Sequence, residues 1–365
     1  MAVSRTFILY LVADQQKNAT VPWTVIGSDA GLSLKPIQTD TLTISIAERW
    51  EVVVDFAQYA GQNVTVQNQR DVGADEDYAG TDRLMRKFTL WFVVGRTVTS
   101  TANNGPIPNP LRAVPFPSQT EVADRHFRFE HSNGRWEING VSIHKVAHFG
   151  YDSSVPNIPQ VVWSDISERV MAPPRRGSIE IWELQNGGGG WTHPIHIHLI
   201  DFQVLSRTGG KRGVLPYEAT SLQDVVWLDV GETVRVIARF APWPGLYMFH
   251  CHNLIHEDHE MLAAFNVTQV PGLNLNETNL FIDPMDPVYR ARAFNQADFI
   301  ARSGPFSTQA IQDKVNFFTA LDAYADVEKV EAQLEAFWTS NNTTRVKREA
   351  LEGKPALKRG NLHLE

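Results

Sequence analysis

The densest group of metal-binding side chains in this sequence is the stretch HCHNLIHEDHEM, residues 250–261. It holds the only cysteine of the chain, Cys251, between two histidines, and it ends on a methionine. A second stretch, WTHPIHIH at residues 191–198, supplies three more histidines. Imidazole nitrogen and sulfur are ligands for copper, zinc and other transition metals. The two stretches together therefore predict a metal centre.

Each stretch contains a His-x-His pair. Twelve histidines among 365 residues predict fewer than one such pair by chance, yet two occur, and one of them surrounds the only cysteine. A single histidine in a strand is usually structural, and a buried cysteine is often a small apolar core residue. The coincidence of both pairs with the cysteine favours a ligand role over these alternatives.

Strand geometry divides these residues between two sites. Both stretches have the composition of β-strands, in which alternate side chains face opposite ways. His196 and His198 therefore share one face, and His250 and His252 share another. If the two strands meet, four imidazoles point at one place. Cys251 then faces the opposite side of its strand and belongs to a different site.

The second site combines His193, Cys251, His256 and Met261. These residues offer nitrogen, sulfur, nitrogen and a weak thioether sulfur, which is the ligand set of a blue-copper electron-transfer centre. Zinc is less favoured, because structural zinc sites use several thiolates or a Cys2His2 spacing. Met261 has an alternative role as an ordinary core residue.

Composition limits the class of protein that carries these sites. The apolar content of 43% and charged content of 20% are those of a globular chain with a substantial core. A net charge of -8 argues against nucleic acid and against an anionic membrane surface as partners. The opening residues resemble a strand and contain no signal-peptide cleavage site. Asn-x-Ser/Thr sequons, which accept glycans only in secreted proteins, occur at Asn18, Asn63, Asn266, Asn276, Asn341 and Asn342.

The pattern of apolar and turn-forming residues predicts an all-β chain with a helical end. Short runs rich in β-branched and aromatic residues fill residues 1–98 and 126–270, and their spacing favours a sandwich or barrel. Residues 99–125 are rich in proline and read as a linker. Residues 271–365 form a C-terminal extension, with helices expected near residues 297–304 and 307–340. The charged last twenty residues are expected to be disordered.

The stretch HPIHIH followed by HCHNLIHEDHEM resembles the C-terminal signature of the multicopper oxidases. Flanking segments such as GGWTHPIHIHLIDFQVLSRTGG and APWPGLYMFHCHNLIHEDHEM are similar to those of fungal bilirubin oxidases, and the likeness runs from residue 2 to about residue 315. The resemblance implies Greek-key cupredoxin-like barrels. Residues 1–98 would be part of the second barrel of such an enzyme, and residues 126–270 would be the third.

The resemblance also implies a role for each ligand. Type 1 copper would be held by His193, Cys251, His256 and axial Met261. His196 would bind type 2 copper, and the type 3 pair would be bound by His198, His250 and His252. Electrons from a small-molecule donor, a phenol or a tetrapyrrole, would enter at type 1 copper. They would pass through Cys251 and its flanking histidines, the expected catalytic residues, to a trinuclear cluster that reduces O2 to water.

Two further residues stand near these ligands. Trp191 resembles a tryptophan that contacts the donor or relays its electron, and the alternative is a packing aromatic. Asp224 resembles a buried acid of the family that supports a copper-binding histidine, and the alternative is a role in a turn or on the surface. His259 has no ligand counterpart and is expected to be solvated.

The sequence departs from the family in one respect. A complete trinuclear cluster in the family uses four His-x-His pairs, but this sequence has no histidine before His126. We therefore expect that the first barrel, part of the second and the secretory signal of an extracellular relative are missing. The type 1 set would be complete, and the type 2 and type 3 sites would be half encoded.

Three functions follow from that expectation. The first is a copper-dependent oxidoreductase, in which this chain alone would not reduce O2. The second is a non-catalytic copper-binding or electron-transfer cupredoxin unit. The third is a structural remnant that binds no copper. The family resemblance favours the first, and the half-encoded cluster favours the second for the chain in isolation.

Overall fold

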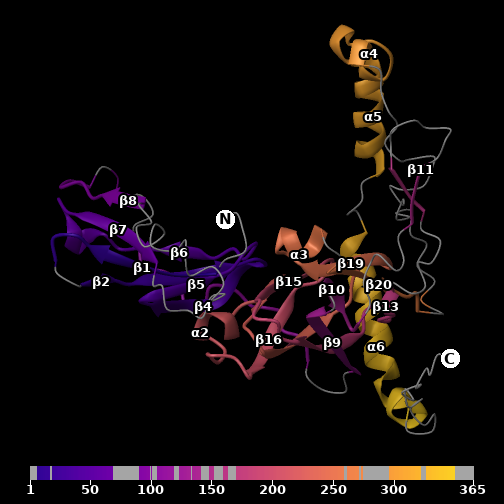
Figure 1. Ribbon diagram of the computed structural model, residues 1–365, viewed down its shortest axis with the longest axis horizontal. Helices are drawn as coiled ribbons and strands as arrows, with labels where there is room; N and C mark the ends of the chain where they lie inside the picture. Colours follow the sequence, from indigo (N-terminus) through magenta and orange to yellow (C-terminus); the bar gives the residue numbers. More distant parts are fainter. Residues whose placement is uncertain are drawn as a thin grey trace. The chain divides into compact units, whose positions relative to one another are not determined.

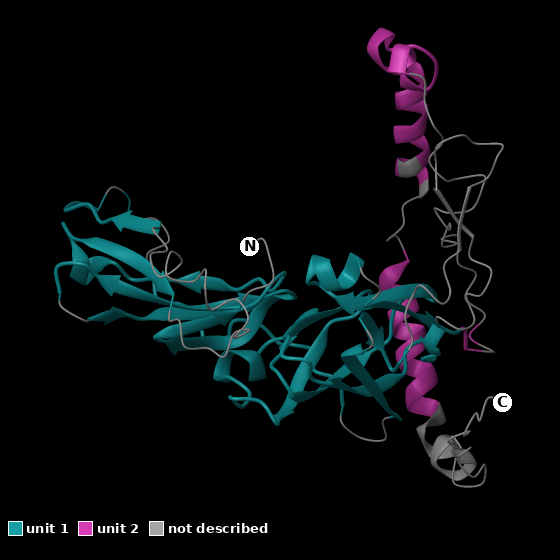
Figure 2. Cartoon of the chain, viewed as in Figure 1, with its two compact units in different colours: residues 1–268 teal, residues 269–365 magenta. Residues whose placement is uncertain are grey.

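The structure of the chain is a computed structural model that describes residues 6–16, 19–68, 90–98, 100, 105–118, 123–132, 134–140, 148–151, 159–162, 170–258, 261–270, 273, 296–321 and 326–349. The chain divides into two compact units (Figure 2), residues 1–268 and residues 269–365. Among the described residues, strands dominate the first unit and helices dominate the second. The all-β expectation with a helical C-terminal end is confirmed.

The first part of unit 1 contains two small antiparallel sheets (Figure 1). One sheet has the order β2-β1-β7-β8 with β5 paired to β1, and the other has the order β4-β3-β6. Apolar side chains from both sheets, such as Leu11 and Val25, are buried between them. Tyr217 from the later part of the chain completes this core. The bounds are β1 Phe7–Ala13, β2 Thr20–Val21, β3 Trp23–Ser28, β4 Gly31–Thr39, β5 Thr41–Ile44, β6 Glu51–Val53, η1 Ala57–Tyr59, β7 Asn63–Asn68 and β8 Leu90–Val93.

The second part of unit 1 contains two five-stranded sheets and a separate hairpin of β11 and β12. The sheet orders are β10-β9-β14-β18-β16 and β13-β20-β19-β15-β17. The bounds are β9 Ala123–Ser132, β10 Arg135–Ile138, β11 His148–Tyr151, β12 Pro159–Val162, β13 Val170–Ala172, β14 Ile179–Asn186, β15 His193–Ile197, β16 Phe202–Thr208, α2 Pro216–Ala219, β17 Val225–Leu228, β18 Thr233–Arg239, β19 Gly245–Cys251, α3 Leu254–Asp258 and β20 Leu262–Val267.

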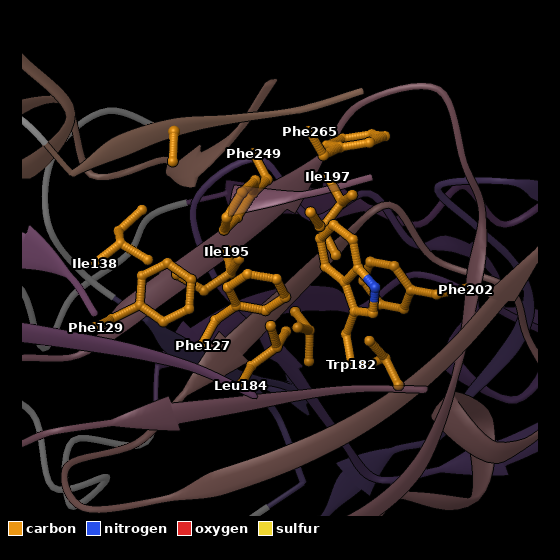
Figure 3. Packing of buried hydrophobic residues seen from close by; sticks show 14 of the residues in the cluster. Phe127, Phe129, Ile138, Trp182, Leu184, Ile195, Ile197, Phe202, Phe249 and Phe265 are labelled. Carbon is orange, nitrogen blue, oxygen red and sulfur yellow. The ribbon is translucent and has the colours of Figure 1, made fainter. Parts of the chain in front are cut away.

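An aromatic core joins these two five-stranded sheets (Figure 3). Phe127 and Trp182 come from one sheet, and Phe249 and Phe265 come from the other. The Phe249 ring lies 4.8 Å from the Phe127 ring and 5.3 Å from the Trp182 ring, centroid to centroid. Large rings at such separations bury much apolar surface and fix the relative positions of the strands. The core therefore holds β19, which carries the cysteine motif, in a rigid setting.

The sequence pattern and the structure differ in a few elements. The run from residue 193 to 207 is two strands, because the chain turns at Leu199, which has a positive φ of 72°. Strands β3, β4, β7 and β13 lie within the ranges 1–98 and 126–270 that were expected to hold β-structure. The helical segment near residues 307–340 is two helices, and the second continues to Glu349, into the segment expected to be disordered. The bounds in unit 2 are α4 Gln296–Ala301, η5 Gly304–Phe306, α5 Thr308–Leu321 and α6 Val327–Glu349.

Helix α6 is the longest helix in the part of the chain that the structure describes. It is rich in charged and polar residues. Among the described residues, neither it nor any other helix combines the length and apolar character needed to cross a bilayer.

Candidate metal centre

The two histidine stretches lie on neighbouring antiparallel strands. In the register of β15 and β19, Ile195 pairs with Cys251 and His196 pairs with His250. Directly paired residues on antiparallel strands place their side chains on the same face of the sheet. The pairing therefore brings His196 and His250 together on one face. It places Cys251 beside Ile195 on the other face, in the apolar core.

On the core face, His193, Cys251 and His256 form a compact triangle of buried donors. The Nδ1 atoms of the two histidines are 3.2 Å apart, and each lies 3.5 Å from the Cys251 Sγ. An ion at the centre of such a triangle is about 2 Å from each donor, close to ordinary metal–imidazole and metal–thiolate bond lengths. The three donors therefore fit a transition-metal ion.

Charge in this triangle also suits a cation. Burial, with a smaller contribution from neighbouring His256, holds the pKa of His193 well below its usual value, so the ring keeps a lone pair. Burial raises the pKa of the Cys251 thiol, because an isolated thiolate is unfavourable in this core. A cation held by these donors would offset that penalty and favour loss of the thiol proton. The site is thus built of neutral donors whose deprotonated sulfur requires a positive partner.

Local backbone hydrogen bonds bring the last two predicted residues to the same place. Helix α3 follows β19 directly and carries the buried His256. The Met261 N–H donates to the His256 carbonyl, and the Cys251 N–H donates to the Met261 carbonyl, each at 3.0 Å. Met261 is buried in the same apolar cluster as Cys251. The structure therefore gathers all four residues of the predicted type 1 set.

Two tryptophans cover the histidines of this triangle. The Trp136 ring stacks on His256 with 3.7 Å between centroids and 24° between planes. Trp191 is half-buried and meets His256 edge-on at 5.2 Å, and it also contacts Trp136 at 5.6 Å. The sequence pattern indicated Trp191 but missed Trp136, since Trp136 lies on β10, 120 residues away from its partner along the chain. The only signal was its place in the strand-like run RWEING.

On the opposite face, His196, His198 and His250 form a second group, with ligand atoms all within 4.8 Å of one another. His198 lies one residue beyond the end of β15 and is held by its N–H, which donates to the Met248 carbonyl. The His252 ring lies beside the group, with its centroid 5.2 Å from His250 and 5.7 Å from His196. The structure thus gathers the four predicted histidines, although the last one of each pair lies just outside its strand.

Hydrogen bonds fix the tautomers of two rings in this group. The Nδ1 of His196 lies 2.8 Å from the Asp224 carbonyl oxygen, so this nitrogen carries the proton. The Nδ1 of His250 faces the Glu257 carboxylate at 3.3 Å and the Cys251 carbonyl at 3.4 Å. The Nε2 atoms of His196 and His250 therefore keep the lone pairs that a metal can bind. The Nε2 atoms of His198 and His250 face each other at 3.3 Å. Such an arrangement suits a cation between the rings.

Two imidazoles in this group, those of His250 and His198, are weaker bases than an ordinary histidine. Burial is the main reason that the pKa of His250 falls to about 3, and the neighbouring histidines add to the effect. The pKa of His198 is lowered for the same reasons. Rings that stay neutral keep their lone pairs for a metal. Glu257 supplies the carboxylate that faces His250. His259, which was expected to be solvated, lies outside the described residues.

Comparison with known proteins agrees with this geometry. The multicopper oxidase family model matches residues 140–270. A bilirubin oxidase from Albifimbria verrucaria is 44% identical over 334 residues, which are 90% of this chain and 54% of the relative. The chain belongs to the multicopper oxidase family. A laccase from Haloferax volcanii is 33% identical to this multicopper oxidase chain over 66% of the chain and 37% of the laccase.

Solved structures confirm the cupredoxin-like fold of this multicopper oxidase chain. A laccase from Pediococcus acidilactici is similar with a TM-score of 0.53 and 26% identity, over 72% of this chain and 47% of the laccase. McoA from Aquifex aeolicus shares the fold with a TM-score of 0.54, over 72% of this chain and 53% of McoA. The chain thus spans about half the length of the bilirubin oxidase and of these two structures.

Proposed function

We propose that this chain supplies the electron-accepting copper site and half of the oxygen-reducing copper cluster of a multicopper oxidase. The donors would be phenols or tetrapyrroles similar to bilirubin, and the acceptor would be O2. In this proposal residues 1–98 correspond to part of a second cupredoxin domain and residues 126–270 to a third. Residues 99–125 link them, and residues 271–365 form an extension.

One observation carries the proposal, namely that Cys251 joins two groups of metal-binding donors. Its Sγ completes the triangle with His193 and His256, whereas its chain neighbour His250 belongs to the group on the opposite face. Copper bound at the triangle would accept one electron at a time, and the second group would supply half of the ligands of the copper cluster that reduces O2. The backbone around Cys251 is then a short covalent path between the two sites.

The protein side chains prepare that path. Cys251 gives up its thiol proton when a cation binds and becomes the sulfur ligand. Trp136 and Trp191 cover the histidines of the triangle and exclude water from it, and the half-buried Trp191 offers a donor an aromatic contact. The protons on Nδ1 of His196 and His250 keep Nε2 free as ligands. Met261 would be a further, weak ligand of copper at the triangle and would tune its reduction potential.

The two copper centres would depend on this chain to different degrees. The triangle has its full ligand set within residues 193–261. The second group has four histidines, whereas the family cluster uses eight, and none of the first 125 residues is a histidine. We therefore propose that the chain by itself takes up copper at the triangle but does not reduce O2. The sequons favour a secreted location for the whole protein.

A non-catalytic electron-transfer unit is the alternative function. The buried triangle with its aromatic cover is sufficient for that role, and the half-encoded cluster favours it for the isolated chain. The two functions differ in oxygen consumption. An enzyme consumes O2 when a phenolic donor is added, whereas an electron-transfer unit is reduced by the donor and stays reduced in air.

Copper analysis combined with an oxygen electrode tests the proposal. The purified chain is loaded with Cu(II), desalted, and assayed with a phenol and with bilirubin. We expect one firmly held copper per chain, blue absorption that the donor bleaches, and no oxygen uptake. Four coppers per chain with turnover to water would overturn the claim about the isolated chain. Loss of all copper on desalting would overturn the copper-binding function itself.

A further inference from the structure

The two parts of unit 1 meet along the segment of residues 220–225, which leads into β17. Strands β3 and β4 hold this segment by hydrogen bonds to its backbone. The Ser28 hydroxyl donates to the Leu222 carbonyl at 2.5 Å, and the Leu34 N–H donates to the Thr220 carbonyl at 2.9 Å. The segment is therefore positioned by residues that precede it by 186 and 194 positions in the sequence.

Two charged side chains from the first part hold Asp224 within this segment. The Arg49 guanidinium donates Nη1–H to Asp224 Oδ1 at 2.8 Å and Nη2–H to Oδ2 at 2.6 Å. The Asp29 carboxylate accepts the N–H groups of Asp224 and Val225, both at 3.2 Å. Asp29 also accepts the Arg49 N–H at 2.7 Å. Side chain and backbone of Asp224 are thus fixed independently.

The Asp224 carbonyl is in turn the group that sets the state of His196. This single oxygen accepts the Ile197 N–H at 3.1 Å and the His196 Nδ1–H at 2.8 Å. A carbonyl cannot donate, so the contact selects the tautomer with the proton on Nδ1. Nε2 then keeps the lone pair that faces the other histidines. Partners of this kind orient metal-binding imidazoles in general.

We propose that Arg49 and Asp29 are positioning residues for His196, acting through Asp224. They hold the Asp224 carbonyl where it can accept the Nδ1 proton, so the first part of unit 1 prepares a metal ligand in the second part. The role of His196 as a copper ligand rests on the function proposed above. The expected tautomer of His196 is independent of that function.

The geometry distinguishes this role from ordinary stabilisation. The Arg49 side chain is 51% exposed, and an exposed ion pair contributes little to folding stability. The bidentate contact of Arg49 with the Asp224 carboxylate fixes the orientation of that group as well as stabilising it. Lysine cannot form a bidentate contact of this kind. Replacing Arg49 is therefore expected to disturb His196 while leaving the fold intact.

The test is a nitrogen-detected NMR measurement of the histidine tautomers in the metal-free chain, labelled with 15N-histidine. His196→Gln assigns the His196 signals. In the original chain we expect His196 to be in the Nδ1–H form. In Arg49→Ala we expect a mixture of both tautomers, and in Arg49→Lys an intermediate population. Arg125→Ala is the matched control, because it removes a similar two-pronged contact, with Glu180, in the other sheet.

A second readout uses Cu(II) alone. Loss of a partner that orients a ligand typically lowers metal affinity by about 10- to 100-fold. We expect Arg49→Ala to weaken Cu(II) binding to the histidine group by that factor and to leave the blue absorption of the triangle unchanged. Unchanged His196 tautomers in a folded Arg49→Ala chain would overturn the inference. Absence of blue absorption in every variant would instead refute the proposed function and leave the tautomer result standing.

Discussion

At the scale of single residues, the candidate centre is defined by neutral donors that burial keeps from ionising alone. His193 and Cys251 are fully buried, and both are held in their uncharged forms. Their types and spacing were predictable from the sequence, because His-x-His pairs and a lone cysteine are visible there. The contact of Trp136 with His256 was not, because it depends on how β10 packs against α3.

Replacement of the sulfur ligand tests the triangle. Cys251→Ser keeps the size of the side chain but removes the soft thiolate that gives a blue-copper site its character. We expect complete loss of the blue absorption on Cu(II) addition. Circular dichroism should be unchanged, since serine fits the same space. Because Cys251 is the only cysteine, no other thiol can substitute for it.

Replacement of Trp136 tests the aromatic cover. Truncating a buried tryptophan costs about 3–5 kcal/mol in the free energy of unfolding, so Trp136→Ala is expected to be strongly destabilised in urea titrations. Trp136→Phe keeps a ring beside His256 and should lose less. We expect both variants to shift the blue absorption band, because the orientation of His256 depends on this stacking. An unshifted band in Trp136→Phe and Trp136→Ala would contradict the assigned contact.

At the scale of elements, the site depends on the register of β15 against β19. Alternation along each strand predicted correctly that Cys251 faces away from the paired histidines. Alternation also placed His198 and His252 beside their partners, and the rings do lie together although both residues are just beyond the ends of their strands. Strands β3 and β4 lie within residues 1–98, which the sequence predicted as β-structure, and a turn follows Ser28. That turn connects the two strands in the structure.

Adjacent residues on β19 allow a matched comparison. Phe249 is fully buried among aromatic rings, whereas its neighbour Met248 is exposed on the other face. Phe249→Ala is expected to lower the free energy of unfolding by about 3–5 kcal/mol, because it leaves a cavity in the core. Met248→Ala should change it by at most about 0.5 kcal/mol. Denaturant unfolding of both variants measures the difference, and equal losses would contradict the assigned register.

At the scale of the whole molecule, buried charges accompany the contact between the two parts of unit 1. Glu48 comes from the first part, and Glu218 lies on α2 with Arg207 and Arg212 as partners. Burial, and to a smaller degree the repulsion by Glu218 and Asp29, raises the pKa of Glu48 to about 7. The composition of the sequence did not reveal this group, because its members become neighbours only through folding.

This raised pKa predicts a pH-dependent stability. In the unfolded chain Glu48 ionises near its ordinary pKa of 4.5, whereas the folded chain keeps the proton until about pH 7. The unfolded state therefore binds fewer protons than the folded state in this window. The stability that protonated Glu48 contributes to the folded chain is lost as the pH rises from 4.5 to 7. Glu48→Gln removes this loss. Its melting temperature relative to the original chain should rise between pH 4.5 and pH 7, and a constant difference would contradict the assignment.

The central claim is that His193, Cys251 and His256 form a copper site that this chain completes by itself. X-ray absorption at the copper edge, measured on the chain loaded with one equivalent of Cu(II), tests it most directly. We predict one short copper–sulfur bond and two copper–nitrogen bonds, with the sulfur contribution absent in Cys251→Ser. Copper surrounded only by nitrogen and oxygen in the original chain would contradict the claim.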